Sequence, residues 1–101
     1  MAAITNPSTK STEFCGEYKL CSMYALPITE ASDTMTFTWA ANGISEIQSA
    51  IVCLNGGQDA ALMEVACSFS GLVVTITSVG EGGLAASDWT AATVNLIVIG
   101  K

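Results

Sequence analysis

The chain has 101 residues, of which half are hydrophobic and only 12% are charged. It contains no His and no Arg, and three Lys are set against nine Asp and Glu, which gives a net charge of −6. This balance excludes nucleic acid and an anionic membrane surface as partners, because both require clustered basic residues.

The first 14 residues are predicted to form an extended arm outside the core, because they are rich in Ser and Thr and contain Pro7. Ile4 and Phe14 are the apolar anchors of this arm, and its backbone is suited to adding to a sheet edge of a partner. We therefore predict Ile4, Pro7 and Phe14 as partner-binding residues. The arm has no apolar run typical of a signal peptide, so synthesis in a reducing cytoplasm is expected. Residues 15–101 are predicted to form a single β domain.

Two alternating segments follow the arm. Residues 17–26 place five side chains on one face, Tyr18, Leu20, Ser22, Tyr24 and Leu26. Pro27 ends this strand, and residues 29–33 form a polar connection. In residues 34–39, Met35, Phe37 and Trp39 alternate with threonines, which predicts that Trp39 packs in the core.

The Asn42-Gly43 pair predicts a hairpin, because both residues tolerate the positive φ of tight turns. A two-residue loop would set Phe37 opposite a glutamine and mix apolar with polar side chains on one face. A three-residue loop, residues 41–43, sets Phe37 opposite Ile47 and keeps both faces consistent. We therefore predict the three-residue loop, with Gly43 at positive φ.

The next two predicted strands are residues 44–54 and residues 62–69, separated by a turn at residues 55–57. The second of these is predicted to point four side chains inward, Met63, Val65, Cys67 and Phe69. Ser70-Gly71 is typical of a two-residue hairpin and predicts the apolar cross-strand pairs Phe69–Leu72, Cys67–Val74 and Val65–Ile76.

The last part of the chain is predicted to contain a Gly-rich loop over residues 80–88, with one helical turn around residues 84–89. Residues 93–99 form a closing strand that is apolar on both faces, as a central strand or an interface strand should be. Together these elements predict an all-β fold: an antiparallel β-sandwich or small barrel of about six to seven strands.

The sequence contains few side chains that are suited to catalysis or to binding a metal or cofactor. Without His, the common general base and the catalytic triad are missing, and we predict that the protein is not an enzyme. The four cysteines, Cys15, Cys21, Cys53 and Cys67, are irregularly spaced and lack a metal-binding knuckle, so we predict free thiols and no metal. Cys53 and Cys67 lie in apolar strand patterns, which predicts that they are buried. The Gly-rich loop lacks the Lys and Ser or Thr of a phosphate loop, and we predict no cofactor.

The aromatic residues leave one alternative open. Trp39, Trp89, Tyr18 and Tyr24 together would suit a sugar-stacking platform, as in a carbohydrate-binding β module. Trp89 follows a polar loop and is also a candidate anchor of a subunit contact, because Trp is enriched at interface hot spots. We include Trp89 among the predicted partner-binding residues.

The surface should be poor in charge. A domain of this size exposes about 5,400 Å², or about 450 Å² for each charged residue, and surfaces of this kind are usually covered by other protein. We therefore predict a homo-oligomer that joins a larger protein assembly.

The closing segment, residues 88–101, reads DWTAATVNLIVIGK and resembles the final strand of small tailed-phage structural proteins. The Thr-, Ala- and Gly-rich, His-free composition and the polar leading arm are similar to those of capsid decoration (cement) proteins. The resemblance implies a virion structural protein that binds between major capsid protein subunits, often as a trimer, on the capsid surface. Components of the phage neck, tail or baseplate share this style and remain alternatives.

Overall fold

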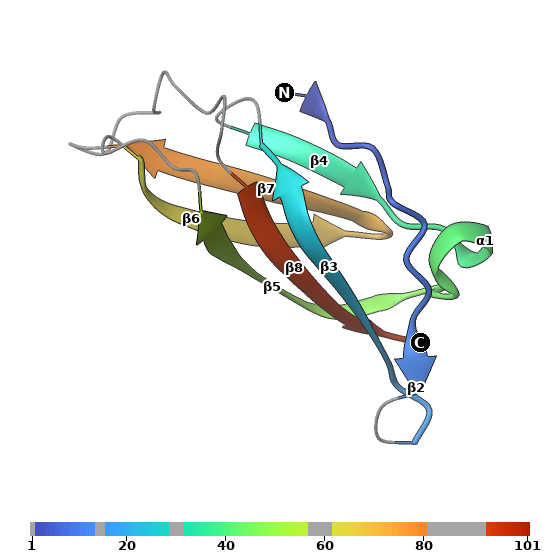
Figure 1. The fold of residues 1–101 in the computed structure, drawn as a ribbon. Helices are drawn as coiled ribbons and strands as arrows, with labels where there is room; N and C mark the ends of the chain where they lie inside the picture. Colours follow the sequence, from blue (N-terminus) through green and yellow to red (C-terminus); the bar gives the residue numbers. More distant parts are fainter. Residues whose placement is uncertain (1, 14–15, 29–31, 57–61, 81–92) are drawn as a thin grey trace.

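The structure is a computed structural model that describes the chain except for residues 1, 14–15, 29–31, 57–61 and 81–92. In the described residues, six long strands and two strands of two residues form two sheets packed face to face (Figure 1). The predicted all-β sandwich is therefore confirmed. Its radius of gyration is 13.6 Å, close to the value of about 13 Å for a compact domain of this length.

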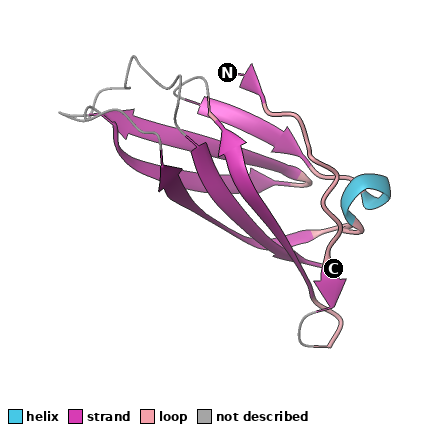
Figure 2. Cartoon of the chain, viewed as in Figure 1, coloured by secondary structure: helices cyan, strands magenta, loops and turns pink. Residues whose placement is uncertain are grey.

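The two four-stranded sheets have the orders β1-β4-β7-β6 and β2-β3-β8-β5, and we name them the β7 sheet and the β8 sheet (Figure 2). The strands are β1 Ala2–Ala3, β2 Thr12–Glu13, β3 Lys19–Pro27, β4 Ser32–Thr36, β5 Ile47–Gly56, β6 Leu62–Ser70, β7 Val73–Gly80 and β8 Thr93–Gly100. Paired strands are antiparallel except β1, which runs parallel to β4.

The core lies between the two sheets and follows from the alternation of each strand. Its buried hydrophobic residues are Cys21, Met23, Leu26, Ile28, Met35, Phe37, Ile44, Ile47, Val74, Ile76, Val94, Leu96 and Val98. The predicted closing strand is β8, and it is central, since it pairs with β3 on one side and β5 on the other.

The β6–β7 hairpin keeps the predicted alternation of faces with a different turn, although Phe69, predicted to point inward, is 40% exposed. Its turn is Gly71-Leu72, with Gly71 at φ 59°, so Phe69 pairs with Val74 and Cys67 pairs with Ile76. The predicted pairing was wrong by two residues. A shift of two leaves every side chain on the same face, because side-chain direction repeats every second residue.

The predicted hairpin at Asn42-Gly43 is wrong. The chain instead crosses from the β7 sheet to the β8 sheet through helix α1, Trp39–Asn42, whose N-cap Thr38 Oγ1 accepts a hydrogen bond of 3.0 Å from Ala41 N. Gly43 ends this helix at φ 72°, so its predicted positive φ is confirmed. A tight turn and a helix C-terminus both require positive φ at this glycine, so the Asn42-Gly43 pair does not distinguish between them.

Two side-chain placements also differ from the predictions. Trp39 was predicted in the core but is 60% exposed, because it lies on helix α1 and not on a strand. In β3, Ala25 adopts φ 57° within a bulge between Met23 and Leu26. The bulge turns Leu26 inward while Tyr24 remains outward, so these two do not share a face.

The first residues do not form a separate arm. Ala2–Ala3 pairs with β4, Thr12–Glu13 pairs with β3, and the side chain of Ile4 packs against the core. The arm thus runs along one edge of the sandwich and joins both sheets (Figure 1). Its strand-forming backbone, predicted to pair with a partner, is used within the chain.

Other predictions fall partly outside the described residues. Strand β5 continues through Asn55 and Gly56, past its predicted end. The last residue of the predicted turn, at position 57, lies outside the described residues. The predicted loop at residues 80–88 lies outside as well, apart from Gly80, which ends β7. So does the helical turn predicted around residues 84–89.

Candidate interaction surface

A buried asparagine holds the arm to the crossover. Asn42 is 0% exposed, and its amide exchanges two hydrogen bonds with the amide of Asn6, at 2.7 and 3.2 Å. Asn42 Nδ2 also donates to the Thr9 carbonyl at 2.9 Å, and its Oδ1 accepts from Thr38 N at 3.2 Å. A buried amide with these partners is satisfied, so the arm is what makes burial of Asn42 possible.

Further contacts fix the arm at the same end of the sandwich. Cys21 Sγ donates to the Thr9 carbonyl at 3.2 Å, and Lys10 Nζ donates to the Ala40 carbonyl. Lys19 Nζ donates to the Gly43 carbonyl at 3.1 Å and lies 4.3 Å from the ring centroid of Trp39. The crossover therefore binds the arm and strand β3 together.

The structure places two of the four predicted partner-binding residues. Ile4 is half-buried against the core and Pro7 is exposed, whereas Phe14 and Trp89 lie outside the described residues. The described part of the arm thus contributes one exposed residue of the predicted set. A larger surface lies elsewhere.

That surface is the outer side of the β8 sheet, which contains none of the predicted partner-binding residues that the structure places. Its side chains form three cross-strand rows, given from β3 through β8 to β5: Leu20, Ile99 and Ser49; Ser22, Ile97 and Ile51; and the pair Asn95 and Cys53, with Tyr24 in the adjoining bulge of β3. We name these nine residues the neutral face, because none is charged. Tyr24 is 76% exposed and Ile51 is 54% exposed.

One signal in the sequence pointed to this face. The closing strand is apolar on both sides, and a strand needs only one apolar side to pack on a core. Its inward residues, such as Leu96, are fully buried, while Ile97 and Ile99 are half-exposed on the outside. The face itself depends on which strands flank β8, and this was not available from the pattern.

The polar groups at one end of the neutral face bond within the chain. Asn95 Oδ1 accepts from Ala25 N at 3.0 Å, in the bulge of β3. Asn95 Nδ2 donates to Asn55 Oδ1 at 3.3 Å, and Asn55 Nδ2 donates to Thr93 Oγ1 at 3.2 Å. Covering this end would therefore not strip these amides of their partners.

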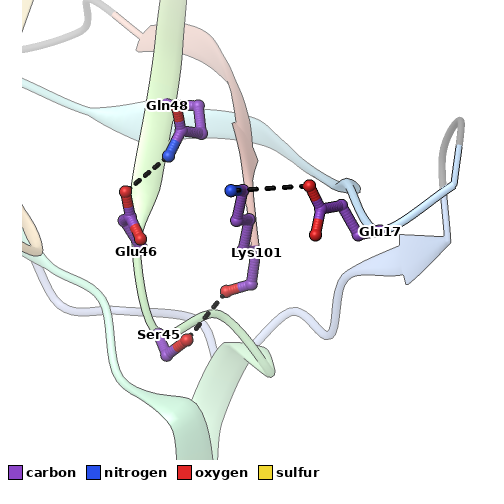
Figure 3. A network of polar contacts seen from close by, with 5 residues as sticks. All are labelled: Glu17, Ser45, Glu46, Gln48 and Lys101. Atoms are coloured by element: carbon purple, nitrogen blue, oxygen red, sulfur yellow. Dashed lines mark hydrogen bonds and ion pairs between the residues drawn. The ribbon is translucent and has the colours of Figure 1, made fainter.

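Charged residues border the opposite end of the neutral face, where β8 ends (Figure 3). Lys101 Nζ lies 3.5 Å from Glu17 Oε1, and the Lys101 carbonyl accepts from Ser45 Oγ at 3.0 Å. Gln48 Nε2 donates to Glu46 Oε1 at 2.6 Å. The positive charge of Lys101 at this rim is thus balanced by the carboxylate of Glu17.

The outer side of the β7 sheet has a different composition. Its three rows, given from β4 through β7 to β6, are Thr36, Val73 and Ser70; Thr34, Thr75 and Ser68; Ser32, Thr77 and Ala66. We name these nine residues the hydroxyl face, since seven of them are Ser or Thr. Hydroxyl side chains of this kind suit contact with water.

Three cysteines are described, and all three are free thiols. Cys21 is buried, Cys67 is half-buried and Cys53 is exposed on the neutral face, whereas the pattern predicted a buried Cys53. Burial raises the pKa of the Cys21 and Cys67 thiols above the ordinary value of 9.0. Both therefore favour the neutral form, as expected of packing residues.

The described aromatic residues do not form one sugar-stacking platform. Lys19 lies over the ring of Trp39, and Lys101 lies 5.5 Å from the ring centroid of Tyr18. Tyr24 is five residues beyond Lys19 along β3, or about 16 Å at the usual strand rise. These rings are thus separated, and two of them are occupied by lysines.

Within the described part of the chain, no pocket is found, and no group of three or more metal-ligating side chains lies together. None of the helices there is long and apolar enough to cross a membrane. In comparisons with known proteins, the chain matches no family model, no curated protein and no solved structure.

Proposed function

We propose that the protein is a non-enzymatic structural protein of a tailed-phage virion, a capsid decoration protein that binds between major capsid protein subunits and stabilises the head. The neutral face supports this proposal most directly. An exposed sheet surface without charge, on a chain with a net charge of −6, is suited to being covered by other protein.

The resemblance of the closing strand supports the same assignment. It favours self-association, with a trimer as the arrangement it implies, and a location on the capsid surface after synthesis in the host cytoplasm. The neutral face is equally compatible with a component of the neck, tail or baseplate. The carbohydrate-binding alternative has less support, because the described aromatic rings are separated.

The experiment is to purify particles of the phage that carries this gene and to quantify peptides of the chain by mass spectrometry. We expect the chain in fixed ratio to the major capsid protein, and antibody labelling on the head. Heads from a deletion of the gene should release DNA at a lower temperature. Absence of the chain from particles would overturn the proposal, and labelling of the neck or tail would favour the alternative position.

The carbohydrate alternative has its own readout. The isolated protein should show no binding on a glycan array. Specific binding to one class of glycan, together with absence from particles, would favour a carbohydrate-binding module.

A further inference from the structure

We propose that the neutral face is a homotypic contact, in which two copies of the chain pack face to face about a twofold axis that runs along β8. This inference rests on the proposed assembly role. It adds the surface and the symmetry through which copies meet. A face that contacts itself about a twofold axis produces a closed pair, in contrast to the trimer implied by the resemblance.

Charge favours a second copy as the occupant. Each copy carries a net charge of −6, so two copies repel each other wherever their charged surfaces approach. The three rows contain no charged side chain, and Lys101 at the rim is paired with Glu17 at 3.5 Å. A basic partner would be attracted to acidic surface elsewhere, whereas two copies meet on this face with little electrostatic cost.

Symmetry sets the arrangement of the strands. With the twofold axis along β8, this strand lies over β8 of the second copy, and β3 lies over β5 of the second copy. Packed sheets are about 10 Å apart with strands within about 30° of each other. Ile97 and Ile99 then each meet their own counterparts, so the most apolar strand of the face lies at the centre of the contact.

Side-chain size also fits this arrangement. In the first row, Leu20 lies at the β3 end and Ser49 at the β5 end, and in the second row Ser22 lies at the β3 end and Ile51 at the β5 end. The twofold axis therefore sets Leu20 against Ser49 of the copy, and Ile51 against Ser22 of the copy. On the two flanking strands, each bulky side chain therefore meets a small one, which is the complementarity a packed interface needs.

The third row follows the same rule. Tyr24, which is 76% exposed and lies in the bulge of β3 beside this row, is set near Cys53 of the copy. Asn95 lies on the axis, and its amide is bonded to Ala25 N and Asn55 Oδ1 in its own chain. Burying this row thus leaves neither amide atom of Asn95 without a partner.

The size of the face predicts a weak pair. The nine residues span five positions on each of three strands, a footprint of about 240 Å², roughly a third of the ~800 Å² that each partner buries in a standard interface. We therefore expect association in the micromolar range. Attachment of several copies to one lattice would raise its effective strength.

The first test is the molar mass by sedimentation from about 1 µM to about 1 mM, the range of weak binding. We expect a monomer at the lower end and a dimer at the upper end. Ile97→Glu should weaken the dimer at least a hundredfold, roughly, because the axis brings two desolvated carboxylates together. The matched control is Thr75→Glu on the central strand of the hydroxyl face, which should leave the dimer unchanged.

A charge exchange tests the arrangement of the rows. Ser22→Glu and Ile51→Lys should each abolish the dimer, because each sets an unpaired charge against the copy. The double variant should restore it, because Glu and Lys then meet across the axis. Thermal unfolding of each variant verifies the fold, and the 54% exposure of Ile51 makes a charge tolerable there in the monomer.

The outcomes separate this inference from the proposed function. A monomer up to about 1 mM, a trimer, a dimer insensitive to Ile97→Glu, or a double variant without rescue would each overturn the twofold contact. If such a protein is nevertheless present in virions, the proposed function stands. A dimer with the expected responses that is absent from virions would leave the contact intact and overturn the function.

Discussion

The neutral face and the hydroxyl face occupy equivalent positions on the two sheets and carry opposite kinds of side chain. On the hydroxyl face the central row is Thr34, Thr75 and Ser68. On the neutral face the central row is Ser22, Ile97 and Ile51. The inner sides of both sheets supply the hydrophobic core, to which the β7 sheet adds the buried polar residues Asp33 and Ser78. The contrast between hydroxyl-bearing and apolar rows lies on the outer sides.

This difference separates the tendency of a residue to form a strand from the apolar character of its side chain. Threonine is β-branched like valine and isoleucine, so it favours extended backbone while its hydroxyl binds water. The β7 sheet shows that a strand of this protein forms with threonine outside. The isoleucines of β8 are therefore more apolar than strand formation requires, and the excess is available for contact with another protein.

The largest effect is expected on the inner sides, where the two sheets should behave alike. Leu96→Ala in β8 and Ile76→Ala in β7 should each lower the free energy of unfolding by about 2–5 kcal/mol, because both side chains are buried and leave cavities. Denaturant unfolding of dilute monomer measures this. The outward Ile97→Ala should cost clearly less, and an equal cost would mean that the neutral face supports the monomer fold.

The arm joins the two sheets through Asn42, and breaking that link is expected to have the next largest effect. Asn42→Ala should cost about 1–3 kcal/mol, because the Asn6 amide and the Thr9 carbonyl lose a buried partner. Hydrogen exchange should also accelerate at Ile4 and Ser11, whose amides donate to Thr34 O and Asn42 O. Asn55→Ala, at the edge of the neutral face, is the control and should leave exchange in the arm unchanged.

Backbone strain should distinguish Gly43, at the crossover, from Gly16, which lies between β2 and β3 in the sequence. Gly43 and Gly16 both have φ 72°, so alanine at either should cost about 1 kcal/mol. A Cβ at Gly43 would lie 3.2 Å from Ser11 Oγ, whereas one at Gly16 meets nothing within 4 Å. Gly43→Ala should therefore be the more destabilising by denaturant unfolding, and the reverse order would contradict the role of Gly43 in holding the arm.

Alkaline pH should weaken the fold by a smaller amount. The raised pKa of the Cys21 thiol means that the folded state holds this proton more tightly than the unfolded state does. Its contribution to stability is complete below the unfolded pKa and is lost as pH rises through the folded pKa. Between about pH 8 and about pH 10, the wild type should lose more stability than Cys21→Ala. Equal losses would contradict this linkage.

Thiol labelling gives the finest comparison of the sheets. In dilute protein, Cys53 on the neutral face should react before Cys67, and Cys21 should react last, following their exposure. At concentrations that favour the dimer, Cys53 should become protected and Cys67 should not. Mass spectrometry of labelled peptides measures the order, and a Cys53 that stays equally reactive would contradict its coverage by a second copy.

Much of the β architecture could be predicted from local pattern. The strand at residues 93–99 and the faces of β6 and β7 follow from alternation, which depends only on neighbouring residues. For the surface proposed to bind a second copy, the sequence contains one indication, which is that the strand at residues 93–99 is apolar on both sides. Leu20, Ile51 and Ile97 are distant in the sequence, and their proximity depends on strand pairing.

By itself, the sequence determined that this protein is a β fold poor in charge, that Gly43 has positive φ, and which side chains of most strands share a face. These properties come from short-range sterics and from composition. Only the tertiary structure decided that residues 39–42 form a helical crossover, that Trp39 is exposed, and that the arm joins both sheets. An Asn-Gly pair satisfies a hairpin and a helix end equally well, so the choice between them rests on the burial of Asn42 and the packing of two sheets, which involve residues far apart along the chain.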